Sequence, residues 1–164
     1  NMARWGVYGV IEDGVEVEVL ITKKGGYLKS ALPVKLANGG DIQPEDGQMD
    51  KLAETAKAFL TSHGYPEMMV TYAQHHNGTA VFNLAPLQQG VVLYPDLVKV
   101  WMDITSGNPI GMVARSYLMF LEFRDFPEPP IYLAHAQQHV AQRIEVLPPR
   151  LVVVPTGDCQ EKPC

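Results

Sequence analysis

The stretch that decides the fold is Tyr94–Leu118, which reads YPDLVKVWMDITSGNPIGMVARSYL. It contains an alternating run over residues 97–104, a Ser-Gly-Asn-Pro turn at residues 106–109, and a second run over residues 110–114. Alternation with a period of two residues is typical of a strand with one buried face. The stretch therefore predicts a β-hairpin, followed by a helix near residues 116–123 that Ser116 would cap.

A similar pattern occurs near the start of the chain. Sliding the sequence along itself places Val15–Ala31 (VEVEVLITKKGGYLKSA) over Val98–Ala114 (VKVWMDITSGNPIGMVA), and both copies are predicted to form strand, turn and strand. The identical positions in the first copy are Val15, Val17, Ile21, Thr22 and Ala31. Alternating strands match one another readily by chance, so the alignment suggests two similar small lobes but leaves a true duplication open.

The strongest helical pattern lies near residues 48–63. Its apolar residues, from Met49 to Leu60, recur at helical spacing, and Gly64 and Pro66 end the pattern. A second, shorter helical pattern is predicted near residues 131–141.

The remaining segments predict more strands. Residues 68–74 and 79–84 flank Asn77-Gly78, which favours a tight hairpin because both central residues adopt positive φ. Shorter strands are predicted at residues 5–11, 90–93 and 151–154. The strands occur in runs between single helices, and this order predicts an α+β fold with antiparallel sheets.

The composition excludes some classes of function. The net charge is −5 and no run of Lys or Arg occurs, so we expect no nucleic-acid partner. No segment has the roughly 18–20 consecutive apolar residues that span a bilayer. The chain begins Asn1-Met2, and we expect any membrane anchor or export signal to lie outside it.

Candidate catalytic and metal-binding residues are few. His135 and His139 are spaced to share one face of the predicted helix, which makes them a weak candidate metal pair, but the residues between them include glutamines and no third ligand is evident. A solvated helix face is the favoured interpretation. Asp96 and Asp103 are interpreted as turn or hairpin residues. No catalytic constellation emerges, so we expect a protein that is not an enzyme and that needs no cofactor.

The two cysteines, Cys159 and Cys164, lie within the last six residues. A disulfide between them, a share in a zinc site completed from elsewhere, and a free thiol near the chain end are all compatible with the sequence. The free thiol is favoured.

Tyr94–Leu118 resembles the PepSY-type repeat of the YpeB-like family of spore germination proteins. The resemblance rests on the Tyr-Pro-Asp-Leu start, the acidic Asp103, the Gly107 turn and the Tyr117-Leu118 pair. It extends to residues 21–32 and 56–72 and to the RLVVVPT segment near the end. The chain departs from the family pattern at Pro109 and after Leu118, where it reads MFLEFRDF.

The resemblance implies tandem PepSY-like lobes, each an antiparallel sheet packed against one or two helices. We expect a first lobe over residues 1–43, completed by a neighbouring helix, and a second over residues 44–164. Tyr94, Trp101 and Tyr117 are candidate partner-binding residues, and core packing is the alternative role for each.

The resemblance also implies a non-catalytic function. Proteins of this family act in endospore germination with a cortex-lytic enzyme that degrades spore peptidoglycan. The chain is therefore expected to stabilise or regulate such a hydrolase, on the exported side of the inner spore membrane and with a membrane anchor outside this chain. The alternative is a PepSY-type peptidase inhibitor or intramolecular chaperone acting on another target.

Overall fold

The computed structural model describes residues 4–10, 15–35, 40, 42–120, 123–127 and 150–154. The first part of the chain forms β1 (Arg4–Val10), β2 (Glu16–Thr22), β3 (Leu28–Pro33), α1 (Gln48–Ser62), β4 (Met68–His76) and β5 (Thr79–Gln88). The second part forms β6 (Val91–Leu93), the 3₁₀ turn η2 (Tyr94–Asp96), β7 (Val98–Asp103), β8 (Pro109–Val113), α2 (Arg115–Met119) and β9 (Val152–Val153).

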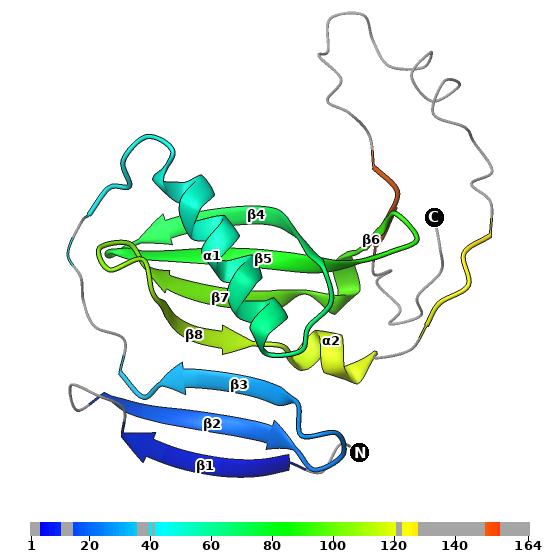
Figure 1. Cartoon of the computed structure of the whole chain (residues 1–164), viewed down its shortest axis with the longest axis horizontal. Helices are drawn as coiled ribbons and strands as arrows, with labels where there is room; N and C mark the ends of the chain where they lie inside the picture. The colour runs from blue at the N-terminus through cyan, green and yellow to red at the C-terminus, as the bar shows by residue number, and fades with distance from the viewer. Residues whose placement is uncertain are drawn as a thin grey trace, which may run out of the picture.

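The strands form one sheet of nine strands in the order β1-β2-β3-β8-β7-β5-β6-β9, and β4 also pairs with β5 (Figure 1). The short β6–β9 pair is parallel, and the other described pairings are antiparallel. The α+β fold with antiparallel pairing is thus the one that the strand order predicts.

Helix α1 covers one face of the sheet, where it crosses β4, β5, β7 and β8 (Figure 1). Its apolar residues Leu52, Ala56 and Leu60 are at most 4% exposed. They pack in one cluster with the inward side chains of the strands, including Phe82, Val98, Val100, Met102 and Met112. Burial of this stripe is the main stabilising contribution to the helix, because isolated helices of this length are marginal in water.

The end of α1 is fixed by backbone geometry. Gly64 adopts a φ of 81°, and its N–H donates to the carbonyl of Thr61 at 3.1 Å. The N–H of Tyr65 donates to the carbonyl of Leu60 at 3.1 Å. These two bonds form a Schellman motif, which satisfies the last helix carbonyls and turns the chain toward β4.

The hairpins β2–β3 and β7–β8 have the same backbone plan. Their first strands end at Thr22 and Asp103 and their second strands begin at Leu28 and Pro109, so counterparts differ by 81 in number (103 against 22, 109 against 28). Each pair has one register shift, between residues 20 and 21 in the first hairpin and between residues 101 and 102 in the second.

The turns of the two hairpins also correspond. The N–H of Thr22 donates to Tyr27 at 2.9 Å, and the N–H of Asp103 donates to Asn108 at 2.9 Å. Residues 26 and 107 are both glycines with positive φ, of 66° and 73°. The structure therefore aligns Val17 with Val98. The alignment of Val15 with Val98 in the sequence is two residues out of register, a shift that keeps every strand residue on the same face.

The two hairpins meet edge to edge. Strand β3 pairs with β8, and Ala31 lies opposite Met112, which is its own counterpart in the repeat. Antiparallel strands paired in this way are related by an approximate two-fold axis perpendicular to the sheet. The two hairpins consequently present equivalent residues on the same face of one continuous sheet.

Some local predictions need correction. Helix α2 begins at Arg115, its N-cap residue is Ala114, and no side chain caps it, so the capping role of Ser116 is wrong. The helix ends at Met119 with Phe120 as its C-cap residue, short of the predicted end at residue 123. Pro109, assigned to the turn from the sequence, is instead the first residue of β8, and β8 lies inside the sheet between β3 and β7.

The hairpin turn after β4 is shorter than the four residues that the sequence suggests. The strand continues through His75 and His76, and the turn consists of Asn77 and Gly78, both with positive φ. The predicted helix near residues 131–141, with His135 and His139, lies outside the described residues, as do Cys159 and Cys164.

Candidate partner-binding groove

The Tyr94-Pro95-Asp96 motif forms the 3₁₀ turn η2 between β6 and β7. Pro95 suits the start of such a turn because its φ is already restricted. Asp96 is 2% exposed, which is rare for a carboxylate unless it is paired.

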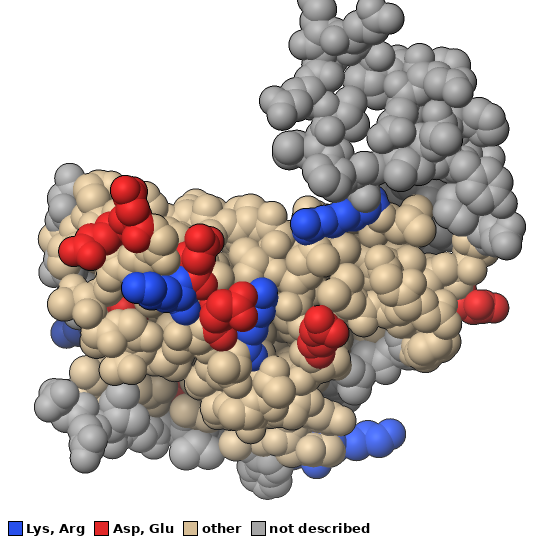
Figure 2. Space-filling model, turned by 45° about the horizontal axis from the view of Figure 1, so that its top comes forward, with Lys and Arg blue, Asp and Glu red and all other residues tan. Residues whose placement is uncertain are grey.

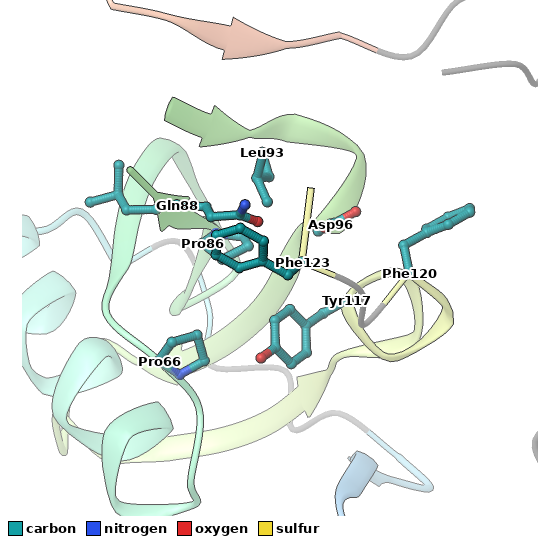
Figure 3. A pocket seen from close by; sticks show the side chains of 9 residues that line it. Pro66, Pro86, Gln88, Leu93, Asp96, Tyr117, Phe120 and Phe123 are labelled. Atoms are coloured by element: carbon teal, nitrogen blue, oxygen red, sulfur yellow. The ribbon is translucent and has the colours of Figure 1, made fainter. Parts of the chain in front are cut away.

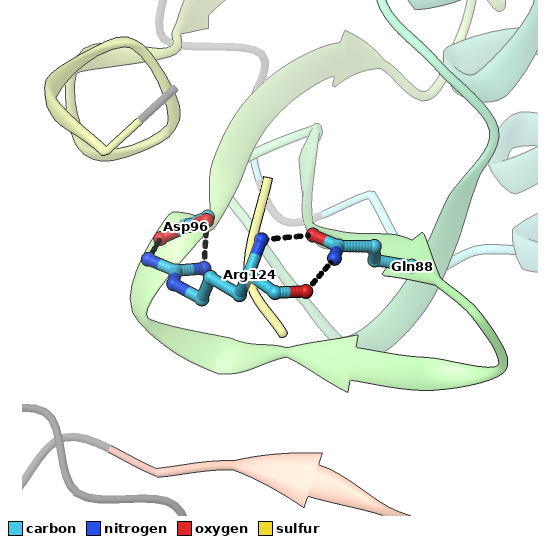
Figure 4. Close-up of polar contacts among 3 residues, drawn as sticks. All are labelled: Gln88, Asp96 and Arg124. Atoms are coloured by element: carbon cyan, nitrogen blue, oxygen red, sulfur yellow. Dashed lines mark hydrogen bonds and ion pairs between the residues drawn. The ribbon is translucent and has the colours of Figure 1, made fainter. Parts of the chain in front are cut away.

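The partner of Asp96 is Arg124, which follows α2 in the chain. The guanidinium donates from Nη1 to Asp96 Oδ2 at 2.6 Å and from Nη2 to Oδ1 at 3.0 Å (Figure 4). The side chains are 15% and 4% exposed for the arginine and the aspartate. This two-bond geometry is the strongest form of an ion pair, and it fixes the direction from which the arginine approaches.

Gln88, at the end of β5, holds the backbone of the same arginine. Its Oε1 accepts from the Arg124 N–H at 3.2 Å, and its Nε2 donates to the Arg124 carbonyl (Figure 4). Both the backbone and the side chain of residue 124 are thus bound to the sheet end. The segment of residues 123–127 is therefore held in place by polar contacts as well as by packing.

Beside this polar cluster lies a groove of about 260 Å³, called the aromatic groove below. It is lined by Pro66, Pro86, Leu87, Gln88, Leu93, Asp96, Tyr117, Phe120 and Phe123 (Figure 3). The lining comes from the loop after α1, from β5, β6 and η2, and from α2 and the segment after it. The groove thus forms where several elements distant in sequence meet.

The rim of the aromatic groove carries exposed phenylalanines. Phe123 is 76% exposed and Phe120 is 41% exposed, and in Figure 3 the ring of Phe120 points away from the other side chains. Met119, in the last turn of α2, is 57% exposed. An apolar patch around a groove marks a surface that binds another molecule more often than a single exposed residue does.

Tyr117 forms one wall of the aromatic groove. Its ring lies 5.3 Å from that of Tyr65 at an interplanar angle of 54°. Burial raises the pKa of the Tyr117 phenol, and the neighbouring Tyr27 and Asp96 raise it further. Burial likewise raises the pKa of Tyr65, with a smaller contribution from Tyr117. Both phenols therefore stay neutral at physiological pH and act through packing and hydrogen bonding.

The three predicted partner-binding residues do not form one site. Tyr117 lines the aromatic groove, whereas Tyr94 is half-buried in η2 and is not part of the lining. Trp101 is half-buried on β7 between Val100 and Met102, which face α1, so its ring lies on the opposite face of the sheet. Their contact with a partner stays a prediction.

Sequence reasoning missed Phe120, Phe123 and Arg124 as members of this site. The signal was the segment MFLEFRDF, which departs from the family pattern and places three phenylalanines and an arginine after α2. The interpretation of Asp96 as a turn residue is incomplete, because its carboxylate also binds an arginine 28 residues further along the chain.

Other candidate residues have structural roles. Asp103 accepts a hydrogen bond from the Ser106 N–H at 2.6 Å and so stabilises the turn after β7. Within the described ranges, no group of three or more His, Cys, Asp or Glu residues could hold a metal ion. In the same part of the chain, no helix is long and apolar enough to cross a membrane. On the face in Figure 2, acidic and basic side chains are interspersed and neither sign gathers in one patch.

Comparison with known proteins decides the family. The family model for YpeB sporulation, PepSY1 and PepSY2 domains, matches residues 8–127. The chain belongs to the YpeB family. Among its YpeB relatives, the sporulation protein YpeB of Halalkalibacterium halodurans is 25% identical over 162 residues, which are 96% of this chain and 35% of that protein.

Two other YpeB proteins are also similar to this chain. Sporulation protein YpeB of Bacillus subtilis (strain 168) is 25% identical over 146 residues, which are 88% of this chain and 31% of that protein. The solved Bacillus megaterium YpeB C-terminal domain has the same fold, with a TM-score of 0.84 and 23% identity over 98% of this chain and 70% of that chain. This chain thus spans about a third of the length of the curated YpeB relatives.

Proposed function

We propose that the chain is a non-catalytic interaction module of a spore germination protein, and that it stabilises or regulates a spore cortex-lytic peptidoglycan hydrolase. The aromatic groove carries the proposal. It is an apolar surface with exposed Phe120 and Phe123, built on a rigid polar support, in a chain of the YpeB sporulation family. In the longer protein we place this module on the exported side of the inner spore membrane, tethered by an anchor outside this chain.

The geometry suits protein binding. Phenylalanine at an interface buries a large apolar area while ordering few rotatable bonds, and aromatic anchors often supply most of the binding energy. Arg124 fixes the position of the neighbouring Phe123 through four hydrogen bonds to Asp96 and Gln88. A rim that is already positioned loses less conformational entropy on binding than a loop that must first become ordered.

The test is co-purification of the chain with the cortex-lytic hydrolase of the same organism, with the affinity measured by calorimetry. Phe123→Ala is expected to weaken binding by about 30-fold, which corresponds to a hot-spot loss of about 2 kcal/mol. Tyr72→Ala is the matched control, because Tyr72 is 47% exposed on β4 and does not line the groove.

Two outcomes would contradict the proposal. One is equal affinity for the Phe123→Ala and Tyr72→Ala variants, which would move the interface away from the aromatic groove. The other is failure of the unmodified chain to bind any cortex-lytic hydrolase while it lowers the activity of an added peptidase. That result would favour the peptidase-inhibitor function.

A further inference from the structure

Strand β4 has a hydrogen-bonded neighbour on one side only. It pairs with β5, and no described strand lies beyond it at that edge of the sheet (Figure 1). The register shifts between Val70 and Tyr72, and the residues after this bulge, 72–76, are all exposed. This stretch is called the β4 edge below. An open edge presents N–H and C=O groups that another extended strand can pair with.

The turn after β4 shows which residues of the hairpin bond to each other. Asn77 and Gly78 have φ values of 50° and 73°, as in the type I′ turn of a two-residue hairpin, so the flanking His76 and Thr79 exchange hydrogen bonds. The other side of the hairpin agrees. The N–H of Ile104, which follows β7, donates to the carbonyl of Gly78 at 2.9 Å, so alternate residues of β5 from Ala80 onward face β7.

The same alternation assigns the backbone groups of the β4 edge. Hydrogen-bonded and non-hydrogen-bonded positions alternate along an antiparallel pair, so Tyr72, Gln74 and His76 bond to β5. The N–H and C=O groups of Ala73 and His75 consequently point away from β5. Among the described residues, these groups have no backbone hydrogen-bond partner.

The β4 edge lacks the usual protection against pairing with another chain. Sheet edges are commonly protected by charged side chains, by proline or by a bulge. The bulge of β4 lies before Tyr72, and the strand, MMVTYAQHH, contains no Lys, Arg, Asp, Glu or Pro. Two copies of this strand therefore bring no like-charged side chains of these types opposite each other, which is the main obstacle to pairing a strand with itself.

Antiparallel pairing of two copies about a two-fold axis at Gln74 uses all the outward groups. Ala73 of one copy then lies opposite His75 of the second copy, and each of the two such pairs exchanges two N–H···O=C bonds. On one face of the sheet, Gln74 meets its own copy, and Tyr72 meets His76 of the second copy. Amide and aromatic pairs across two strands add to the stability of a sheet.

We propose that the β4 edge binds a second copy of this chain, which adds its own β4 in antiparallel orientation about Gln74 and continues the sheet through the dimer. The chain already joins its two hairpins in this way, since β3 pairs edge to edge with β8. Five residues from each copy form a small interface, so the dimer is weak and reversible. The β4 edge shares no residue with the aromatic groove, so the proposal is independent of hydrolase binding.

The first experiment removes an outward N–H while keeping the bonds between β4 and β5. The unmodified chain should dimerise as its concentration rises in sedimentation velocity. Ala73→Pro should raise the dissociation constant of the dimer at least about tenfold, because it removes two of the four interchain bonds. Its monomer should stay folded, because proline is tolerated where the N–H faces away from the sheet. Ala73→Val, which keeps the N–H, is the matched control and should dimerise like the unmodified chain.

A neighbouring proline tests the assignment of the backbone groups. Gln74→Pro removes a bond to β5, so it should lower the free energy of unfolding clearly more than Ala73→Pro does. Equal losses of stability would overturn the assignment and the proposal with it. His75→Pro is a second outward variant, so that poor folding of Ala73→Pro leaves another variant to decide.

Interchain disulfide formation tests the register in a chain with Cys159→Ser and Cys164→Ser. The two copies of residue 74 form a non-hydrogen-bonded pair with Cα atoms about 4.5 Å apart, within the range of a disulfide, so Gln74→Cys should cross-link. Tyr72→Cys is the control, because its side chain is also exposed. In this register, the two copies of residue 72 lie about 14 Å apart along the strands and should not cross-link.

Four results would overturn the proposal. One is a chain that stays monomeric over the whole concentration series. Another is a dimer that Ala73→Pro leaves unchanged, which would place the contact at a different surface, such as the edge of β1. A third is cross-linking through Tyr72→Cys instead of Gln74→Cys. The last is a monomeric chain whose binding to the hydrolase is abolished by Ala73→Pro, which would assign the β4 edge to that partner.

Discussion

The hairpins β2–β3 and β7–β8 share a backbone plan but differ in what covers them. Both have the same register, the same register shift and the same turn bond. Met102 is fully buried under α1, whereas its counterpart Ile21 is only half-buried. The comparison teaches that the hairpin geometry comes from local sequence, while burial depends on an element that arrives from another part of the chain.

A second difference lies at the start of the two hairpins. Asp96 is buried before β7, and its counterpart in the repeat is Val15, which is 38% exposed. Because a carboxylate at this position binds Arg124, the segment after α2 is fixed at the end of the sheet. The aromatic groove is therefore a specialisation of the second hairpin rather than a property of the repeat.

The largest effect on stability is expected from removing the ion pair between Asp96 and Arg124. Arg124→Ala leaves the Asp96 carboxylate buried without its main counter-charge, which should lower the free energy of unfolding by about 3–5 kcal/mol. Urea denaturation measures this loss. The control is Arg115→Ala, an exposed arginine of α2, and a similar loss in both variants would refute the special role of the ion pair.

The next effect compares equivalent apolar residues. Met102→Ala should cost about 2–5 kcal/mol because it empties a fully buried site, and Ile21→Ala only about 1 kcal/mol because its site is half-exposed. The measurement is again urea denaturation of both variants. Equal costs for the two variants would contradict the comparison.

A smaller effect concerns the contact between the loop after α1 and the first hairpin. Tyr65 follows α1, and its hydroxyl donates to the carbonyl of Leu28 at the start of β3. Tyr65→Phe removes this bond and should cost about 1 kcal/mol. Chemical denaturation at neutral pH measures the loss, and an unchanged free energy of unfolding would show that the bond contributes nothing.

The same tyrosine predicts a pH dependence. The folded state holds the pKa of Tyr65 above its ordinary value of 10.0, so the unfolded state loses its proton first as the pH rises. The contribution of the Tyr65 proton to the free energy of unfolding is therefore fully present below pH 10, and it is lost as the pH rises above 10. The free energy of unfolding of Tyr65→Phe should therefore fall less steeply between about pH 10 and 12 than that of the unmodified protein. Parallel curves would contradict the assignment.

The smallest difference is expected between the turns, which are the part that the two hairpins share. Gly26→Ala and Gly107→Ala each force a side chain into a backbone conformation with positive φ, at a cost of about 1 kcal/mol. An added Cβ meets no atom within 4 Å at Gly26, and the nearest atom at Gly107 is 4.0 Å away, so the costs should be equal. Thermal melting of the two variants checks this, and a clear inequality would mean that the two turns are not equivalent.

The sequence predicts the fold correctly, but it aligns the two copies of the repeat incorrectly. Alternation located the strands, and Asn77-Gly78 located a turn that the structure confirms. The alignment of Val15 with Val98 maximised identities, yet it was two residues out. In a strand, a shift of two residues leaves every side chain assigned to the same face of the sheet. The error is therefore visible only from the pairing partners of each residue.

The candidate site was less accessible to sequence reasoning. Tyr117 was found because it belongs to a recognisable motif. Phe123 and Arg124 were not found, because nothing in their local pattern indicates that residue 124 reaches Asp96 and Gln88. Contacts between residues so far apart depend on how the chain returns to the sheet end after α2.

The sequence by itself determined the strands, the turns, the amphipathic α1 and membership of the YpeB family, because these depend on residue type and local spacing. The tertiary structure decided which equivalent surfaces are covered, which carboxylate meets an arginine, and where the exposed phenylalanines gather. The physical reason is that burial and ion pairing depend on partners distant in the chain, whereas turn geometry and alternation act between near neighbours.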